Sequence, residues 1–201
     1  MGSIAVVHHV RSAPDGAAVE RALSAAPHRG DALEVRTLGA VSLGISNAPE
    51  LTDAWIASDD GRAAVVTGTL DNADELGLDG GDPAAQVLAA FDAWGADAPA
   101  RLRGVFSAAW TDGTKLVVFR DQLGLAPLFH RESPDGFVAA TEGKQVVAGA
   151  GIAREPDVEA VEAMFFGRFD ARGTMLRGIE RFPRASTATV NGGGPASFHR
   201  Y

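Results

Sequence analysis

Residues 102–120 read Leu-Arg-Gly-Val-Phe-Ser-Ala-Ala-Trp-Thr-Asp-Gly-Thr-Lys-Leu-Val-Val-Phe-Arg. Two β-rich runs, 105–110 and 115–120, are separated here by Thr111-Asp-Gly113. An Asp-Gly turn between two such runs predicts an antiparallel hairpin. The stretch therefore indicates a sheet in which strands consecutive in the chain lie side by side.

Further short strands are expected on both sides of this hairpin. An apolar run at 3–10 predicts a buried strand at the start of the chain. The other expected strands, each bounded by turn residues, cover 33–38, 41–45, 55–58, 63–69, 127–130, 136–140, 186–190 and the last residues of the chain after a glycine turn at 192–194.

Helices are expected in separate groups between these strands. The most clearly marked covers 83–94, because Asp82-Pro83 combines a capping residue with proline at the first helical position and Gly95 ends the apolar pattern. Others are expected at 15–26, 97–103, 143–150 and 157–166. Grouped antiparallel strands and grouped helices predict a layered α+β fold, and no linker divides residues 1–201 into two domains.

Composition excludes several classes of function. A formal charge of -8 provides no cationic surface for a nucleic acid backbone. No apolar run approaches the roughly 20 residues that span a bilayer, and no secretion signal is evident, so a cytoplasmic location without membrane contact is expected. The five histidines have no metal-binding spacing, and zero cysteines exclude disulfides, thiolate metal sites and a thiol nucleophile.

The hairpin and the residues after it resemble motifs of the asparagine synthetase family. In the glutaminase domain of that family an "LRGMFAFALWD" hairpin is followed by "RDRFGIKPLYY"; here Leu102 to Trp110 is followed by Arg120-Asp-Gln-Leu-Gly-Leu-Ala-Pro-Leu-Phe-His130. Fragments similar to other family motifs occur in the family's order at 28–31, 66–76, 137–146, 154–158 and 175–183.

This resemblance implies an N-terminal class II glutamine amidotransferase domain of the Ntn type. The implied fold is a four-layer αββα sandwich of two antiparallel sheets between helices. The family's nucleophile is a cysteine that removal of the initiator Met exposes, and its own α-amine serves as base. The acyl intermediate is stabilised by an Asn side chain and a Gly backbone N–H.

The positions that match these catalytic groups are degenerate in this chain. Gly2 stands where the family has cysteine, and Thr67-Gly68 replaces Asn-Gly. The arginine that clamps the glutamine carboxylate has no counterpart near 44–47. Asp82 matches the acid that holds the glutamine amine, although capping of a helix explains it equally well. These vestigial positions leave no catalytic residue.

The resemblance therefore implies a pseudoenzyme similar to the N-terminal domains of β-lactam synthetases and lasso-peptide macrolactam synthetases. Such a domain is a structural and docking partner of an ATP-dependent amide- or macrolactam-forming synthetase domain. No cofactor is expected on this chain, and ATP and Mg are expected only on the partner. A peptide or a second copy of the chain are further possible partners.

Three alternatives remain open at this point. Trimming of two residues would make Ser3 an N-terminal nucleophile, and the chain would then be an active Ntn amidohydrolase. The domain is otherwise a stand-alone module that binds a small molecule or peptide in the vestigial cleft. A start of Met1-Gly2-Ser3 altered by cloning is the third alternative.

One expected helix has more apolar side chains than a single buried face needs. They are candidates for contact with a second domain, with burial in the core as the alternative, and comprise Met164, Phe165, Phe166 and Phe169.

Overall fold

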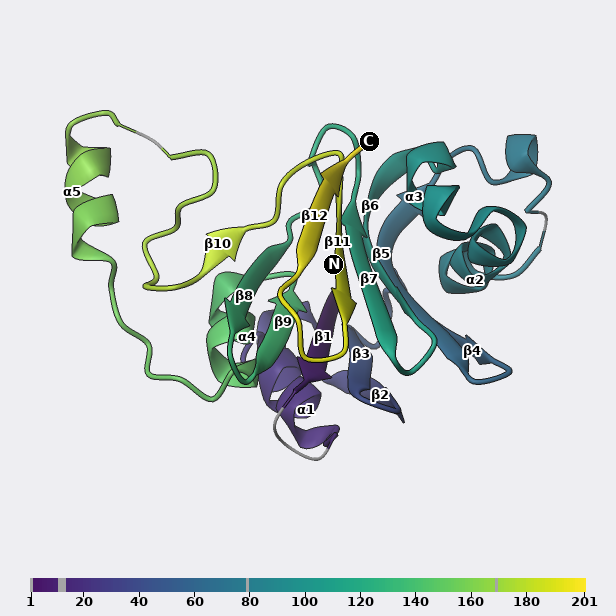
Figure 1. The fold of residues 1–201 in the computed structure, drawn as a ribbon, viewed down its shortest axis with the longest axis horizontal. Helices are drawn as coiled ribbons and strands as arrows, with labels where there is room; N and C mark the ends of the chain where they lie inside the picture. Colours follow the sequence, from purple (N-terminus) through teal and green to yellow (C-terminus); the bar gives the residue numbers. More distant parts are fainter. Residues whose placement is uncertain (1, 11–13, 79, 169) are drawn as a thin grey trace.

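A computed structural model describes residues 2–10, 14–78, 80–168 and 170–201. The strands in this part of the chain form two antiparallel sheets of six (Figure 1). The first sheet contains β1 (Ser3–His9), β2 (Ala32–Leu38), β3 (Val41–Asn47), β8 (Phe129–Ser133), β9 (Gly136–Ala140) and β10 (Glu180–Arg181). The second contains β4 (Ala54–Asp59), β5 (Arg62–Leu70), β6 (Gly104–Thr111), β7 (Lys115–Arg120), β11 (Ser186–Asn191) and β12 (Ser197–Arg200).

The strand order places the start of the chain near the middle of the first sheet. That sheet has the order β10-β8-β9-β1-β3-β2, and the second has the order β12-β11-β7-β6-β5-β4. β6 and β7 form the predicted hairpin, with Trp110 opposite Val117. β1 pairs with β3 on one side and β9 on the other. From Ala5 onwards β1 is therefore paired on both sides, whereas Ser3 is paired with β3 alone.

Helices cover the outer face of each sheet. α1 (Ala17–Ser24) and α4 (Gly143–Gly149) pack on the first sheet, while α2 (Pro83–Trp94) and α3 (Ala98–Arg101) pack on the second. Short 3-10 helices lie at Pro27–Arg29, Asp74–Leu76 and Gly95–Asp97. The result is the expected αββα order of layers. α5 (Val158–Phe165) stands apart from it.

Three hydrophobic clusters fill the spaces between these layers. Because side chains alternate along a strand, Val65 of β5 lies between the sheets, whereas the adjacent Val66 lies under α2. In β1, Ile4 and Val6 likewise face the second sheet, and Ala5 and Val7 face α1 and α4. This alternation decides which residues at the chain start face the space between the sheets.

The loop after β7 is held by Arg120 and Asp121. The guanidinium of Arg120 donates to the carbonyls of Ala126 and Phe182 at 2.6 and 2.7 Å. The Asp121 carboxylate accepts hydrogen bonds from the amides of Leu123, Leu125 and Ala126. The charged pair therefore holds the loop between β7 and β8.

Some boundaries differ from the expectation. β8 begins at Phe129, two residues later than predicted, and proline at 127 has no N–H to donate to a ladder. α3 is a single turn preceded by a 3-10 helix. The two-residue β10 was not predicted, because its pairing with His130 and Phe129 carries no local pattern. No helix of the described residues is long and apolar enough to cross a membrane.

Candidate functional site

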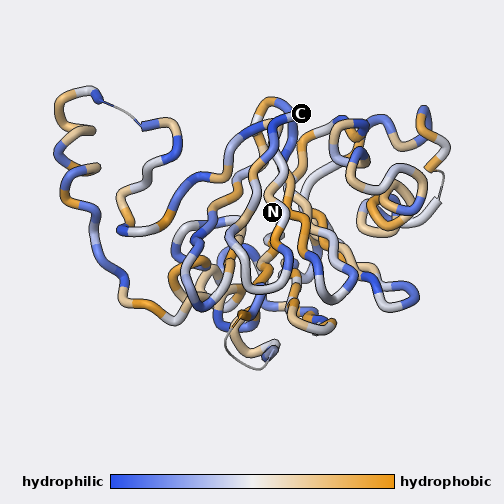
Figure 2. The backbone as a smooth tube through the Cα atoms, viewed as in Figure 1, coloured by the Kyte–Doolittle hydropathy of each residue, from blue (hydrophilic) through white to orange (hydrophobic). Residues whose placement is uncertain are grey.

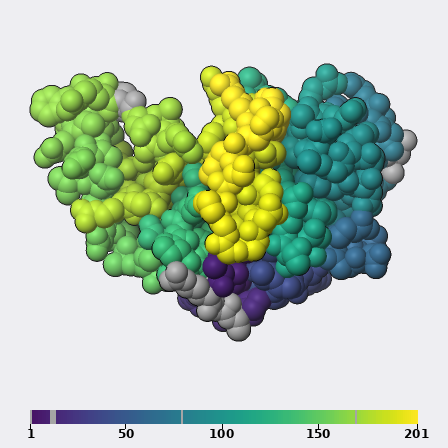
Figure 3. All heavy atoms as spheres, in the orientation of Figure 1, coloured from purple at the N-terminus to yellow at the C-terminus, as the bar shows by residue number. Residues whose placement is uncertain are grey.

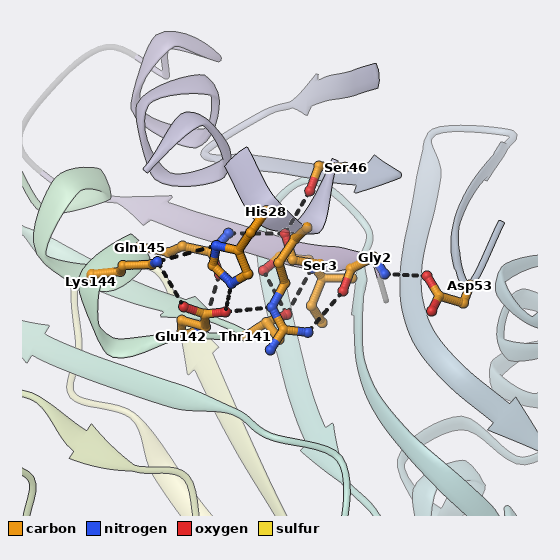
Figure 4. A network of polar contacts seen from close by, with 11 residues as sticks. Gly2, Ser3, His28, Ser46, Asp53, Thr141, Glu142, Lys144 and Gln145 are labelled. Atoms are coloured by element: carbon orange, nitrogen blue, oxygen red, sulfur yellow. Dashed lines mark hydrogen bonds and ion pairs between the residues drawn. The ribbon is translucent and has the colours of Figure 1, made fainter. Parts of the chain in front are cut away.

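The position of the family nucleophile, Gly2, is buried at the entrance to β1. Its N–H donates a hydrogen bond to Oδ1 of Asp53, and its carbonyl accepts one from Nη1 of Arg29 at 3.4 Å (Figure 4). Residue 2 is therefore fixed from both sides by side chains of other elements.

No space exists at Gly2 for a side chain. A Cβ atom built there would lie 2.7 Å from Oδ1 of Asn47, 2.7 Å from Oδ1 of Asp53 and 2.7 Å from the backbone carbonyl oxygen of Ser46. Real Cβ atoms essentially never approach this closely. Since one of the three is a main-chain atom in β3, a side chain at this position requires movement of the strand as well as of two side chains.

The two positions that match the family's oxyanion donors meet at one acceptor. Oγ1 of Thr67 and the backbone N–H of Gly68 both donate to the carbonyl oxygen of Asp53, each at 3.1 Å. Gly68 has a φ of 99°, and a Cβ there would lie 1.9 Å from the carbonyl oxygen of Val105. Position 68 therefore requires glycine. The N–H of Gly68 is already hydrogen-bonded to the backbone carbonyl of Asp53.

Asn47 holds the turn that carries Asp53. Its Nδ2 donates to the carbonyl of Ala54 at 2.8 Å, and its Oδ1 accepts from the amides of Asp53 and Ala54 at 3.3 and 3.1 Å. Sequence reasoning missed both Asn47 and Asp53. An asparagine that ends a strand just before Ala-Pro was the available signal, since Asn side chains commonly bind nearby backbone.

Ser3 faces away from Gly2. It is fully buried in β1, its Oγ lies 2.7 Å from Oγ of Ser46, and it accepts a hydrogen bond from Nε2 of Gln145 in α4 at 2.9 Å. The hydroxyl therefore points into the outer layer with α4, whereas residue 2 faces the space between the sheets.

A cluster of charged side chains lies beside Gly2 (Figure 4). Glu142, which caps α4 through a capping box, accepts hydrogen bonds from Arg29 at 2.5 Å and from His28 at 2.8 Å, and lies 3.3 Å from Nζ of Lys144. Burial alone would raise the pKa of Glu142, but the hydrogen bonds from Arg29, His28 and Lys144 lower it to about 2. Sequence reasoning singled out His28-Arg29 as a motif but not Glu142.

Asp82 acts as the N-cap of α2. Its Oδ1 accepts hydrogen bonds from the amides of Ala84 and Ala85, each at 2.9 Å. Within the described residues, the hydrogen bonds of this carboxylate join it to its own helix rather than to the group around Gly2. The geometry accounts for Asp82 by capping alone.

Comparison with known proteins decides the family. The glutamine amidotransferase domain family matches residues 81–201, which is more than half of the chain. This chain belongs to that family. A search of curated proteins finds no significant match.

Two solved structures are similar to this glutamine amidotransferase domain over its whole length. One is a glutamine phosphoribosylpyrophosphate amidotransferase from B. subtilis, with a TM-score of 0.66 and 14% identity. The other is an allosteric regulatory enzyme of purine biosynthesis, with a TM-score of 0.64 and 13% identity. Both matches cover 100% of this chain and 49% of the other, so the domain spans about half the length of these relatives.

These likenesses show the Ntn-type glutamine amidotransferase fold expected from the sequence. The more specific resemblance to the asparagine synthetase family rests on the sequence motifs alone.

No group of three or more His, Asp or Glu side chains in the described part of the domain is arranged to hold a metal ion. His8 and His9 occupy successive positions of β1 and so face opposite sides of the sheet. Burial lowers the pKa of both. His8 lies in the space between the sheets, with Nε2 3.4 Å from the carbonyl oxygen of Thr114.

One cavity in the described part of the domain lies away from Gly2. It measures about 450 Å³ and is lined at the other end of β1 by Val7, His9, Arg21 of α1 and Asp135. Because β1 has seven residues, this cavity lies roughly 20 Å from Gly2, the position that matches the family nucleophile. It is therefore separate from the site that the family uses.

Proposed function

We propose that this glutamine amidotransferase domain is catalytically degenerate and belongs to the asparagine-synthetase-like type. It acts as a structural and docking partner of a synthetase domain that forms amides or macrolactams with ATP. In this proposal ATP and Mg bind only to the synthetase partner. The setting is the cytoplasm, where ATP is available.

The packing at Gly2 is the observation that carries the proposal. An Ntn glutaminase needs a nucleophilic side chain at this residue, and glycine has none. The neighbouring atoms at 2.7 Å from a built Cβ also leave no volume for a side chain. A nucleophile and the space for its side chain are therefore both missing, which is the pattern expected when catalysis has been lost and folding retained.

The engaged donors at Thr67 and Gly68 support the same reading. Removal of one oxyanion donor typically slows an enzyme by about 100-fold to 1,000-fold. Here the hydroxyl and the amide at these positions both bind the Asp53 carbonyl. A developing oxyanion would have to displace that carbonyl before it could be stabilised.

The placement of Ser3 argues against the alternative of an amidohydrolase with a processed N-terminus. Its hydroxyl is buried and bound to Ser46 and Gln145 on the opposite face of β1 from residue 2. To act as nucleophile in the space between the sheets, Ser3 would have to leave the ladder that pairs it with Ser46.

The test is the release of ammonia from glutamine by the purified domain, alongside an active class II amidotransferase as positive control. We expect no release above the buffer rate. Mass spectrometry of the mature N-terminus accompanies the assay, because a terminus at Ser3 together with measurable release would establish the hydrolase instead. The docking role is tested by co-expression with the synthetase domain encoded together with this one.

A further inference from the structure

The segment around α5 projects from the body of the domain (Figures 1 and 3). Phe165 is 79% exposed and Phe166 is 76% exposed, and Figure 2 shows the hydrophobic residues of α5 in this projecting position. Burial in the core, which was the simpler expectation, is therefore wrong for these two side chains; Phe169 lies outside the described residues. No contact of the described residues shows what covers the two rings, so they do not assign a partner.

The free edge of β2 does indicate a partner. β2 lies at one end of the first sheet and pairs with β3 alone among the described strands (Figure 1). With seven residues it is the longest of the four edge strands, compared with six in β4, four in β12 and two in β10. None of its residues is buried. A long exposed edge offers unpaired N–H and C=O groups to a further strand.

Every second residue of β2 directs its backbone groups to this edge. A two-residue loop joins β2 to β3, with Leu38 opposite Val41 as the closing pair. The closing pair of such a turn is hydrogen-bonded, and along an antiparallel ladder bonded pairs alternate with unbonded ones. The even-numbered residues of β2 therefore face β3, and the odd-numbered residues face outward. The Val35 carbonyl agrees with this direction, because it accepts a hydrogen bond from Nη1 of Arg36 at 3.2 Å.

The charges of β2 are self-complementary in an antiparallel pair. Glu34 and Arg36 lie on the same face of the strand, and their side chains are 44% and 46% exposed. A two-fold axis through Val35 places Glu34 of each copy directly opposite Arg36 of the other, and it also aligns the outward backbone groups of both strands. Opposite charges at such cross-strand positions are favourable. An axis through Glu34 or through Arg36 would instead place like charges against each other.

The other edge strands lack this pattern. β4 contains a single charged residue, Asp59, and β12 contains Arg200 without an acidic residue. The two residues of β10, Glu180 and Arg181, are adjacent and so face opposite sides of the sheet. Among the edges of the described structure, β2 therefore combines length, exposure and both signs of charge on one face.

In a single copy the same side chains already contact each other. Arg36 binds Glu34 at 2.5 Å in addition to the Val35 carbonyl. Pairing exchanges these contacts: Arg36 turns to Glu34 of the second copy, and the Val35 carbonyl accepts the Val35 N–H of the second copy. Because contacts are exchanged and the surface of one strand is small, the self-association should be weak.

We propose that the free edge of β2 is the contact surface for a second copy of this domain. The two strands pair antiparallel about Val35, with Glu34 and Arg36 of each copy joined across the axis, so that the first sheet continues from one copy into the other. The proposal does not depend on the loss of catalysis or on a synthetase partner.

Analytical ultracentrifugation of the purified domain, at concentrations up to about 1 mM, measures the self-association. We expect a concentration-dependent dimer. Glu34→Arg and Arg36→Glu each place like charges at both cross-strand positions, so each variant alone should associate at least about tenfold more weakly. An equimolar mixture of the two should regain association, because the positive strand of one variant then meets the negative strand of the other. Contacts within one copy cannot produce this recovery.

Two further variants separate the edge from a general effect of charge. Val35→Pro removes the N–H at the axis without changing a charge, and proline is tolerated where an edge-strand N–H faces solvent. It should also abolish the dimer. Glu155→Arg is the matched control, because Glu155 forms an exposed ion pair with Arg177 in the segment that carries α5, and it should leave the dimer unchanged. Thermal melting establishes that each variant is folded.

A wild-type domain that stays monomeric at all these concentrations overturns the inference. A dimer that neither charge reversal weakens overturns it as well, and so does a mixture of the two reversals that fails to associate. The proposed function is unaffected by these results, because it is tested by ammonia release and by co-expression.

Discussion

The carbonyl oxygen of Asp53 accepts a hydrogen bond from the backbone N–H of Gly68 at 3.1 Å. The resemblance to asparagine synthetases implies that this N–H would stabilise an oxyanion. The same aspartate binds the N–H of Gly2 through its side chain. Asp53 therefore engages both the backbone donor at Gly68 and the N–H of Gly2, the two positions that match the family's oxyanion donor and nucleophile.

Gly2→Ala tests whether residue 2 has room for a side chain. The added methyl group would meet three oxygen atoms at 2.7 Å, so we expect a loss of about 1–3 kcal/mol in the free energy of unfolding. Gly194→Ala is the control, because a Cβ there meets only the Asn191 carbonyl oxygen at an ordinary 3.6 Å. Urea denaturation gives both values. Equal stability of the two variants would show that residue 2 has room for a side chain.

Gly2→Cys tests whether a thiol at residue 2 gives glutaminase activity. We expect no measurable ammonia release, since the cysteine has neither space nor free oxyanion donors. Alkylation of the only thiol in the chain reports its accessibility. If the variant folds and hydrolyses glutamine at the rate of the positive control, residue 2 alone separates this chain from an active glutaminase and the proposed degeneracy of the other positions is wrong.

Asn47→Ala removes the side chain that holds residues 53 and 54. Three hydrogen bonds are lost and the partners are partly buried, so we expect destabilisation by about 1–3 kcal/mol. Hydrogen exchange at the Ala54 and Gly68 amides should also become faster. Asn191→Ala at the exposed end of β11 is the control. Unchanged exchange at both amides would contradict the role given to Asn47.

Glu142 should make stability depend on pH in the acidic range. Its folded pKa of about 2 lies below the usual 4.5, so the unfolded chain takes up the proton first as the pH falls. The stabilisation by Glu142 is complete above about pH 4.5 and is lost as the pH falls from 4.5 to 2. Glu142→Gln should flatten this part of the stability profile. A wild-type profile that is already flat below 4.5 would refute the prediction.

His130 should make stability depend on pH in a different range. Burial beside Phe137, Phe182 and Phe198, with Arg172 nearby, lowers its pKa from 6.5 to about 4. The unfolded chain therefore binds the proton more readily, and stability falls as the pH drops from 6.5 to 4. The loss should reach about 3 kcal/mol at pH 4. His130→Phe should reduce the slope in chemical denaturation between these pH values, and the slope that remains comes from groups such as His8 and His9, whose pKa values burial also lowers. A variant with the full wild-type slope would exclude His130 as a cause.

Local pattern was enough to predict most of the elements. The Asp-Gly turn predicted the hairpin of β6 and β7, and Asp82-Pro83 together with Gly95 predicted both ends of α2. These signals lie within a few residues of the structure that they specify. β10 could not be predicted in this way, because it pairs with β8 across some 50 residues of chain. The late start of β8, by contrast, agrees with a local signal, the proline at 127.

For the site, the sequence by itself determined what is absent: a glycine at residue 2 and no cysteine leave no thiol nucleophile. Only the tertiary structure decided what occupies the space. Asp53 lies 51 residues from Gly2, and Glu142 lies 113 residues from Arg29. Contacts at such separations depend on how the sheets and helices pack, which no local pattern encodes. The same holds for Phe165 and Phe166, whose apolar character is evident in the sequence but whose exposure follows from α5 standing outside the layers.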